Sequence, residues 1–165
     1  MAKSSLTVTV KIEGAREILR AFSVLPKDAQ KSIRDHSQTL AKKLVPKAVV
    51  DMTAHGGPQG PLLATTIKAV RDRVPVISMG GTRRLGRHRA PAYGMLFGSV
   101  FGMNGYSGWF SAARYRGSSG HQYRPHRGQE AYAFFPLVER EATTISREWN
   151  AAADEVIRKF SEGGV

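Results

Sequence analysis

The apolar residues near the end of the chain recur with the period of an α-helix. Steps of three and four residues separate Val138, Ala142, Ile145, Trp149, Ala152, Val156 and Phe160. This spacing places them on one face, and a helix with one apolar face has to bury it against other elements. We therefore expect a helix over this range that packs into a core, with Trp149 as an anchor of that core.

An earlier stretch has the same period. Its apolar stripe consists of Ala29, Ile33, Ser37, Leu40, Leu44 and Ala48, while lysines and arginines occupy the other faces. Pro26 suits the first turn of this long helix, and Pro46 is expected to kink it or to end its regular part. A shorter amphipathic helix is expected to follow Gly14 and to end before Leu25.

Two parts of the chain have the patterns of β-strands. Leu6, Val8, Val10 and Ile12 alternate with polar residues, as in a strand with one buried face. After a loop rich in Gly and Pro at 53–61, residues 62–81 indicate two β-rich pieces around 71–73, and Pro75 favours an edge position. Together these elements predict an α+β fold, in which a long helix in the N-terminal half and a C-terminal helix pack on a small β-sheet.

Length and composition limit the classes of protein. A chain of 165 residues fits a single domain, 1–165, and without cysteine it holds neither a disulfide framework nor a thiolate zinc site. Its 25 Lys and Arg against 13 Asp and Glu leave a net charge of +12, which indicates an acidic partner. No apolar run reaches the length of a membrane span, so we expect no membrane partner and a cytosolic location where the protein is made.

Much of the positive charge lies in one segment. Residues 80–130 contain eight arginines, no lysine and one acid, so they carry +7 of the net charge, and they are rich in glycine. We expect this range to be an extended Gly/Arg-rich arm or loop inserted in the domain. Its candidate interface residues are Arg83, Arg84, Arg87, Arg89, Tyr93, Phe97, Phe101, Trp109, Arg114, Arg116, Arg124 and Arg127.

Three interpretations of this arm remain open. Arginine and aromatic residues are favoured anchors of protein interfaces, which is the interpretation we prefer. The same mixture neutralises phosphates and stacks on bases, so a nucleic acid is the alternative partner. A solvated basic loop is the third, although the use of arginine without lysine favours bidentate pairing with carboxylates or phosphates.

Motifs for catalysis or for cofactor binding do not stand out. The sequence has no GxSxG, Walker-type glycine loop or HExxH motif. His121 and His126 lie five residues apart in a loop without a neighbouring carboxylate, whereas zinc takes three or four ligands. We expect no catalytic, cofactor-binding or metal-binding residues, and no enzymatic activity.

The order of these elements resembles the neck or tail-completion proteins of bacteriophages with long non-contractile tails. The first strand, the helix AREILRAF, the LPK junction and the long basic helix are similar to the opening of that family. GPLLATTI at 60–67, AYGMLFGS at 92–99 and FFPLVEREATTISREW from Phe134 are similar to its later segments. Pro61, Thr66 and Leu96 depart from the family pattern, and residues 102–127 are an insertion.

The resemblance implies a structural protein of the virion without a cofactor. It implies a ring of six copies at the head-tail junction, which joins the connector and stopper proteins to the tail terminator and lies near the packaged DNA. The arm would then reach a neighbouring subunit or ring. The alternative function is that of a basic nucleic-acid-binding protein that uses the same arginines on phosphates.

Overall fold

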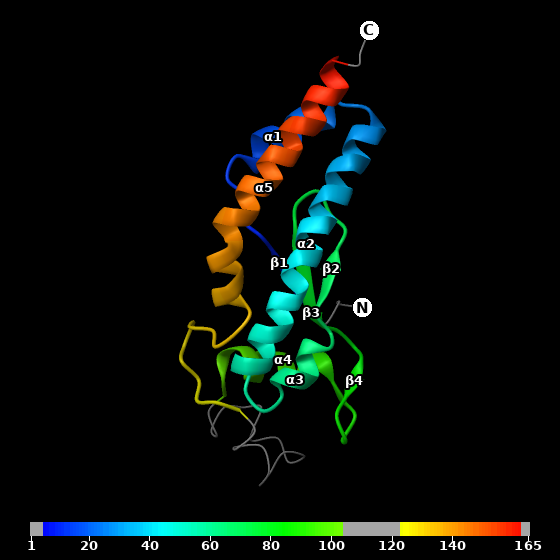
Figure 1. The fold of residues 1–165 in the computed structure, drawn as a ribbon. Helices are drawn as coiled ribbons and strands as arrows, with labels where there is room; N and C mark the ends of the chain where they lie inside the picture. Colours follow the sequence, from blue (N-terminus) through cyan, green and yellow to red (C-terminus); the bar gives the residue numbers. More distant parts are fainter. Residues whose placement is uncertain (1–4, 104–122, 163–165) are drawn as a thin grey trace. The chain divides into compact units, whose positions relative to one another are not determined.

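The α+β fold class is confirmed in a computed structural model that describes residues 5–103 and 123–162 (Figure 1). In chain order the elements are β1 (Ser5–Thr9), α1 (Ala15–Ser23), α2 (Lys27–His55), α3 (Gly60–Ala64), β2 (Lys68–Val70), β3 (Val76–Gly80), β4 (Arg84–Leu85), β5 (Ala90–Pro91), α4 (Ala92–Phe101) and α5 (Phe135–Glu162). Three strands form a small antiparallel sheet in the order β1-β3-β2, and β4 pairs with β5.

The chain divides into two compact units. Unit 1 comprises Met1–Leu6, Pro46–Ile67 and Ser78–Leu137, and unit 2 comprises Thr7–Val45, Lys68–Ile77 and Val138–Val165. Each is described separately below. That residues 1–165 form a single domain stays a prediction.

The apolar stripe of α2 is buried as expected, whereas three residues of the α5 stripe, Ala142, Ala152 and Phe160, are only half-buried. In α2 the whole stripe from Ala29 to Ala48 is buried, and Ile33 and Leu44 are each 1% exposed. In α5, Val138, Ile145 and Val156 are buried and Trp149 is completely so. Residues at steps of three and four share a helical face, so the core of unit 2 follows directly from the spacing.

A polar residue in the α2 stripe has a specific partner. The indole N–H of Trp149 donates to Ser37 Oγ at 2.9 Å and to the carbonyl oxygen of Arg73 at 3.1 Å. The Ser37 hydroxyl in turn donates to the same Arg73 carbonyl at 2.8 Å. These bonds join α5, α2 and the β2–β3 connection within unit 2, and they satisfy polar groups that burial would otherwise leave unpaired.

The structure corrects the prediction about Pro75, and it excludes one of the two alternatives expected for Pro46. Pro75 does not mark an edge, because β3, which begins just after it, is the central strand of the sheet. Since Pro75 precedes the strand, its missing N–H costs no ladder bond, and its carbonyl accepts from Val10 N at 3.0 Å. Pro46 does not end its helix, because α2 continues to His55.

Part of the expected β-rich region is helical. Leu63 and Ala64 are buried in the short helix α3, which has proline in its first turn, and only residues from Lys68 onward form strands. Proline is preorganised for the start of a helix, and Leu and Ala favour helix over strand. The short apolar run alone could not distinguish the two structures.

The segment 80–130 contains more regular structure than an extended arm. Up to Phe101 it forms the β4–β5 hairpin and α4, and Ala92, Met95, Leu96 and Val100 of α4 are buried. Burial of these side chains offsets the flexibility that glycine introduces. Residues 104–122 lie outside the described residues, and residues 123–130 form neither helix nor strand.

Candidate functional site

The structure assigns the candidate interface residues to three groups. Trp109, Arg114 and Arg116 lie outside the described residues. All the others belong to unit 1. The first group is the arginine hairpin, residues 83–91, with Arg83, Arg84, Arg87 and Arg89; the second is α4, with Tyr93, Phe97 and Phe101; the third is the loop that holds Arg124 and Arg127.

The arginine hairpin is a short antiparallel ribbon with a tight turn. Arg84 pairs with Pro91 and Leu85 with Ala90. In the turn Gly86 has φ 68° and Arg89 has φ 50°, and Arg89 N donates to the Gly86 carbonyl at 3.1 Å. Glycine enters this region of φ without steric cost, which fits Gly86 to the first turn position.

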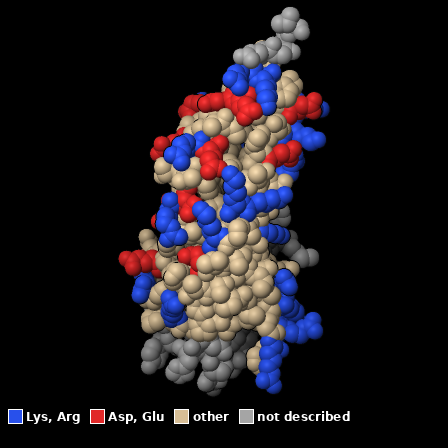
Figure 2. Space-filling view, viewed as in Figure 1, with Lys and Arg blue, Asp and Glu red and all other residues tan. Residues whose placement is uncertain are grey.

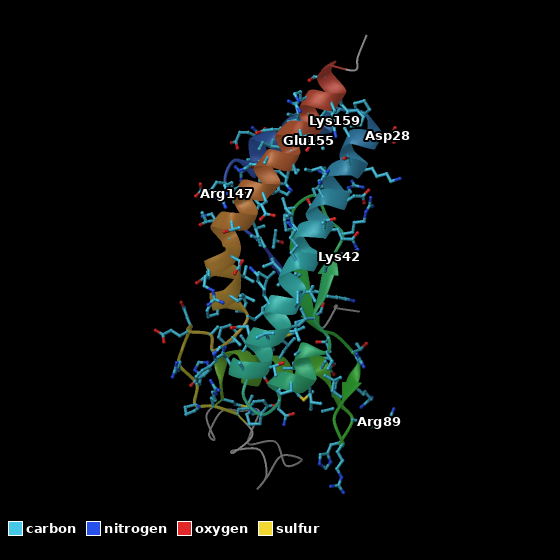
Figure 3. All side chains as sticks on the ribbon, in the orientation of Figure 1. Asp28, Lys42, Arg89, Arg147, Glu155 and Lys159 are labelled. Atoms are coloured by element: carbon cyan, nitrogen blue, oxygen red, sulfur yellow. The ribbon has the colours of Figure 1, made fainter. Side chains whose placement is uncertain are left out.

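Hydrogen bonds hold the base of the hairpin against the start of α4. Ala92 N donates to the Arg83 carbonyl at 2.9 Å, and Tyr93 N donates to the Gly81 carbonyl at 3.1 Å. These bonds satisfy N–H groups at the helix N-terminus that have no partner within the helix. Arg89 lies near the turn of the hairpin (Figure 3), and Gly86 at the start of the turn lies close to the Leu62 side chain of α3.

In the part of the chain that the structure describes, the guanidinium groups of the hairpin have no acidic partner. Arg84 Nη1 donates to the Arg89 carbonyl at 3.0 Å, and Arg83 Nη1 lies 3.4 Å from the Thr65 carbonyl. All four arginines are exposed, and none forms an ion pair with a carboxylate in the described part of the chain. Figure 2 shows the hairpin as a blue group without red side chains beside it. The hairpin is therefore a concentrated, uncompensated positive charge.

Helix α4 is apolar on its exposed face as well as on its buried one. Phe97 is 71% exposed and Tyr93 is 44% exposed. They border an apolar groove of about 310 Å³ that is lined by Ser5, Leu6, Tyr93, Leu96, Phe97, Val100 and Phe101. The Phe97 and Phe101 rings stack with their centroids 6.1 Å apart. Exposed aromatic side chains gathered around a groove are typical of an interaction surface.

The third group packs on its own chain. The guanidinium carbons of Arg124 and Arg127 lie 5.1 Å and 4.3 Å from the centre of the Tyr132 ring, and the Tyr132 hydroxyl donates to the Pro125 carbonyl at 2.8 Å. Cation–π contacts of this kind stabilise the local fold. Arg124 and Arg127 therefore have a structural role in unit 1 that the sequence pattern did not indicate.

The same loop fits closely against the end of α4. Met103 N donates to the Arg124 carbonyl at 2.7 Å, and Gly102, with φ 76°, brings its α-carbon against the Arg124 and Pro125 carbonyls. A side chain at position 102 would collide with that backbone. Packing therefore requires glycine at this position. From the glycine-rich composition alone, only flexibility was expected.

Asp51 of α2 is a residue that the sequence analysis missed. Its carboxylate, on a side chain only 12% exposed, accepts from Phe134 N at 2.7 Å and lies 3.1 Å from His55 Nδ1. Phe134 is fully buried and has φ 72°, a conformation that a bulky residue rarely adopts. Asp51 thus holds the residue that directly precedes α5. The only hint in the sequence was an acidic residue next to the apolar Met52, which the structure then shows to be buried.

Replacement of Asp51 by alanine is expected to lower the free energy of unfolding by about 1–3 kcal/mol, because it leaves the Phe134 N–H without its charged acceptor. Urea unfolding followed by circular dichroism measures this change. Asp51→Asn is the matched control: it keeps an oxygen acceptor and should lose less. Equal stability of Asp51→Ala and the wild type would show that this hydrogen bond contributes nothing.

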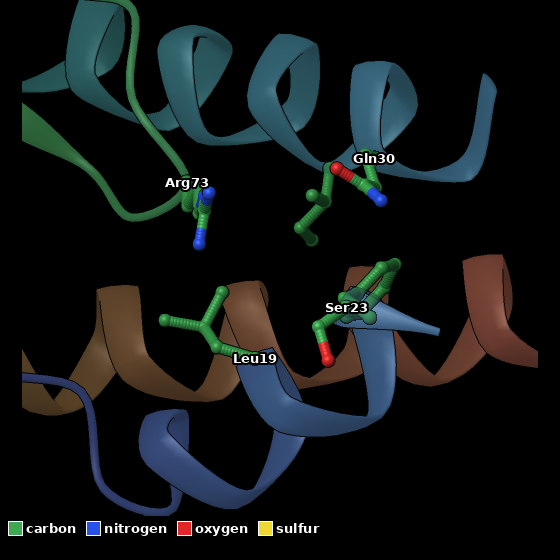
Figure 4. Close-up of a pocket in the computed structure, with 6 residues that line it drawn as sticks. Leu19, Ser23, Gln30 and Arg73 are labelled. Carbon is green, nitrogen blue, oxygen red and sulfur yellow. The ribbon is translucent and has the colours of Figure 1, made fainter. Parts of the chain in front are cut away.

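A second pocket lies in unit 2 and offers less chemistry. About 180 Å³ in volume, it is lined by Leu19, Phe22, Ser23, Gln30, Ile33 and Arg73 (Figure 4). The Ser23 hydroxyl donates to the Arg20 carbonyl at 2.6 Å, and Gln30 Nε2 donates to the Leu25 carbonyl at 3.3 Å. Because these polar groups bond to backbone, they are not directed at a ligand.

Known kinds of site and known proteins give no further assignment. Within residues 5–103 and 123–162, no three His, Asp or Glu side chains lie together in a way that could hold a metal ion. In the same residues no helix has both the length and the apolar character to cross a membrane. Comparisons with protein-family models, curated proteins and solved structures gave no match.

Proposed function

We propose that this chain is a structural protein of a bacteriophage particle, which forms a ring of copies at the junction of the head and a long non-contractile tail. The observation that carries this proposal is the apolar groove beside α4, with Phe97 71% exposed at its border. The exposure of large aromatic side chains to water is unfavourable, and the free energy falls when a partner covers them. We assign the groove to a neighbouring copy of the same chain.

The distribution of charge favours a head-to-tail contact between copies. Unit 1 holds ten Lys and Arg against two Asp and Glu, whereas unit 2 holds fifteen against eleven. An isologous contact between two α4 faces would bring two strongly positive units together, and like charges oppose it. A groove that instead meets unit 2 of the next copy, which carries less net charge, reduces this repulsion, and such a heterologous contact generates a ring when its rotation closes.

The resemblance to the neck and tail-completion proteins supplies the location. The order of β1, α1, the long α2 and the proline-containing start of α5 supports the resemblance, which rests on the same order of segments in the sequence. The ring then joins the connector and stopper proteins to the tail terminator. Six copies and the absence of enzymatic activity are further parts of this proposal.

Microscopy of purified phage particles tests the location. We expect density for the chain in a closed ring between head and tail, together with tailless heads when its gene is interrupted. A particle that lacks the chain, or carries it along the tail tube, would contradict the proposal.

A further inference from the structure

We propose that the arginine hairpin binds the phosphate backbone of double-stranded DNA. This is a function beyond ring formation and uses a different surface of unit 1. Within seven residues the hairpin carries Arg83, Arg84, Arg87 and Arg89 together with His88, and all of them are exposed. A polyanion is the partner that pairs with so many cations at once, because each phosphate neutralised releases condensed counterions.

The turn of the hairpin differs in chemistry from the apolar groove beside α4. Leu85, the one large apolar side chain of the ribbon, is only 7% exposed and points into the unit. The turn itself consists of Gly86, Arg87, His88 and Arg89, with no exposed apolar group. Protein interfaces draw most of their energy from desolvated apolar and aromatic anchors, whereas phosphate binding needs only charge and donors. The groove beside α4 has such anchors and the hairpin has none.

Unit 1 of a second copy offers few acids to these arginines, and three of the eleven acids of its unit 2 already have a cationic partner. Unit 1 has only Asp51, which is bonded to Phe134 N, and the single exposed Glu130. In unit 2, Glu148 lies 2.7 Å from Lys43, Asp35 lies 2.8 Å from Arg71 and Glu155 lies 2.7 Å from Lys159.

The pKa of Glu155 also reflects its pairing with Lys159. The Lys159 ammonium, hydrogen-bonded to the carboxylate, holds the pKa of Glu155 below its ordinary value. Carboxylates that already have cationic partners would have to exchange them to bind the hairpin, and such an exchange gains little at an exposed site. The charge of the hairpin is therefore better matched by an external polyanion than by these three paired acids.

The shape of the hairpin suits a groove of DNA. A two-stranded β-ribbon fits the major groove of B-form DNA, and arginines along its edges reach the phosphates on both sides. The Arg84 bond to the Arg89 carbonyl and the bonds of the hairpin base to α4 hold the ribbon in one conformation before binding. A preorganised ribbon loses less conformational entropy than a flexible arm when it binds.

The salt dependence of DNA binding provides the test. The full-length protein is titrated onto a fluorescent 30-base-pair duplex at several salt concentrations, as wild type and with Arg83, Arg84, Arg87 and Arg89 all changed to Gln. Because the variant cannot neutralise the four phosphates, the log–log slope should fall in magnitude by about 3.6, and affinity near 0.1 M salt should fall by about 10²–10³-fold. The change of the same four residues to Lys should leave the slope unaltered, because phosphate binding needs the charge and not the planar fork.

Two further variants make the outcome decisive. A matched control removes the same charge from unit 2 by changing the exposed Arg16, Arg20, Lys27 and Lys31 to Gln, and we expect it to leave the slope unchanged. The single change Arg87→Gln, at a turn residue, should lower the slope by about 0.9 even if the fourfold variant does not fold. Equal slopes for the hairpin variant and the wild type, or equal losses in both fourfold variants, would overturn the proposal. So would unchanged DNA binding with impaired self-association, which would assign the hairpin to a protein partner.

Discussion

Trp149→Ala is expected to lower the free energy of unfolding by about 3–5 kcal/mol, the range found when a large buried aromatic side chain is truncated. The indole is fully buried on the stripe that also contains Ile145 and Val156. Its removal leaves a cavity and takes away the donor to Ser37 Oγ and to the Arg73 carbonyl. A loss of this size is enough to unfold a marginally stable domain.

Urea unfolding measures this loss, and a second variant separates its two causes. Trp149→Phe retains most of the apolar volume but not the N–H, so it should cost less than Trp149→Ala. The Arg73 carbonyl still accepts from Ser37 in that variant, which limits the unsatisfied polarity. If Trp149→Ala were nearly as stable as the wild type, the stripe of α5 would face a partner and not the core.

The proposed contact between copies predicts that Phe97→Asp leaves the chain monomeric under conditions in which the wild type assembles. Phe97 is 71% exposed, so the change should alter the stability of the monomer little. At an interface it places a carboxylate where an aromatic anchor is buried, and the loss of such an anchor costs about 2 kcal/mol or more at each contact. Because every contact in a ring carries the same change, the losses accumulate around it.

Native mass spectrometry and light scattering measure the number of copies in the assembly. Val50→Asp is the matched control, since Val50 is another exposed apolar residue of unit 1, 69% exposed on α2 and outside the groove. We expect Val50→Asp to assemble normally and Phe97→Leu to retain much of the wild-type assembly. Rings of normal size with Phe97→Asp would show that the groove is not the contact between copies.

Local periodicity was sufficient for α1, α2, α5 and the first strand. The stripe of α2 was predicted residue by residue, because a helix of period 3.6 with one apolar face can bury it in only one orientation. In α5 the prediction was correct for Val138, Ile145, Trp149 and Val156, but it missed the buried Ala153. The alternation from Leu6 to Ile12 predicted β1 in the same way, although the strand ends at Thr9 and its last two apolar residues, Val10 and Ile12, are buried beyond it.

The candidate site was predicted only in part. The arginines and aromatic residues were identified as an interface, but the pattern did not distinguish the exposed hairpin arginines from Arg124 and Arg127, which stack on Tyr132. Nor did it show that Leu6, some 90 residues from Phe97, lines the same groove. These relations depend on which distant segments meet, and sequence spacing carries no information about that.

By itself the sequence determined the helical faces, the fold class, the excess of positive charge and its concentration in one segment, because these properties depend on neighbours along the chain. Only the tertiary structure decided that β3 is the central strand, that the glycine-rich segment folds into a hairpin and an apolar helix, and that Asp51 holds Phe134. The place of β3 and the Asp51 hydrogen bond depend on partners far away in the chain, and α4 packs against α3, some 30 residues earlier. Burial against that partner, and not local propensity, selects the conformation of a short segment.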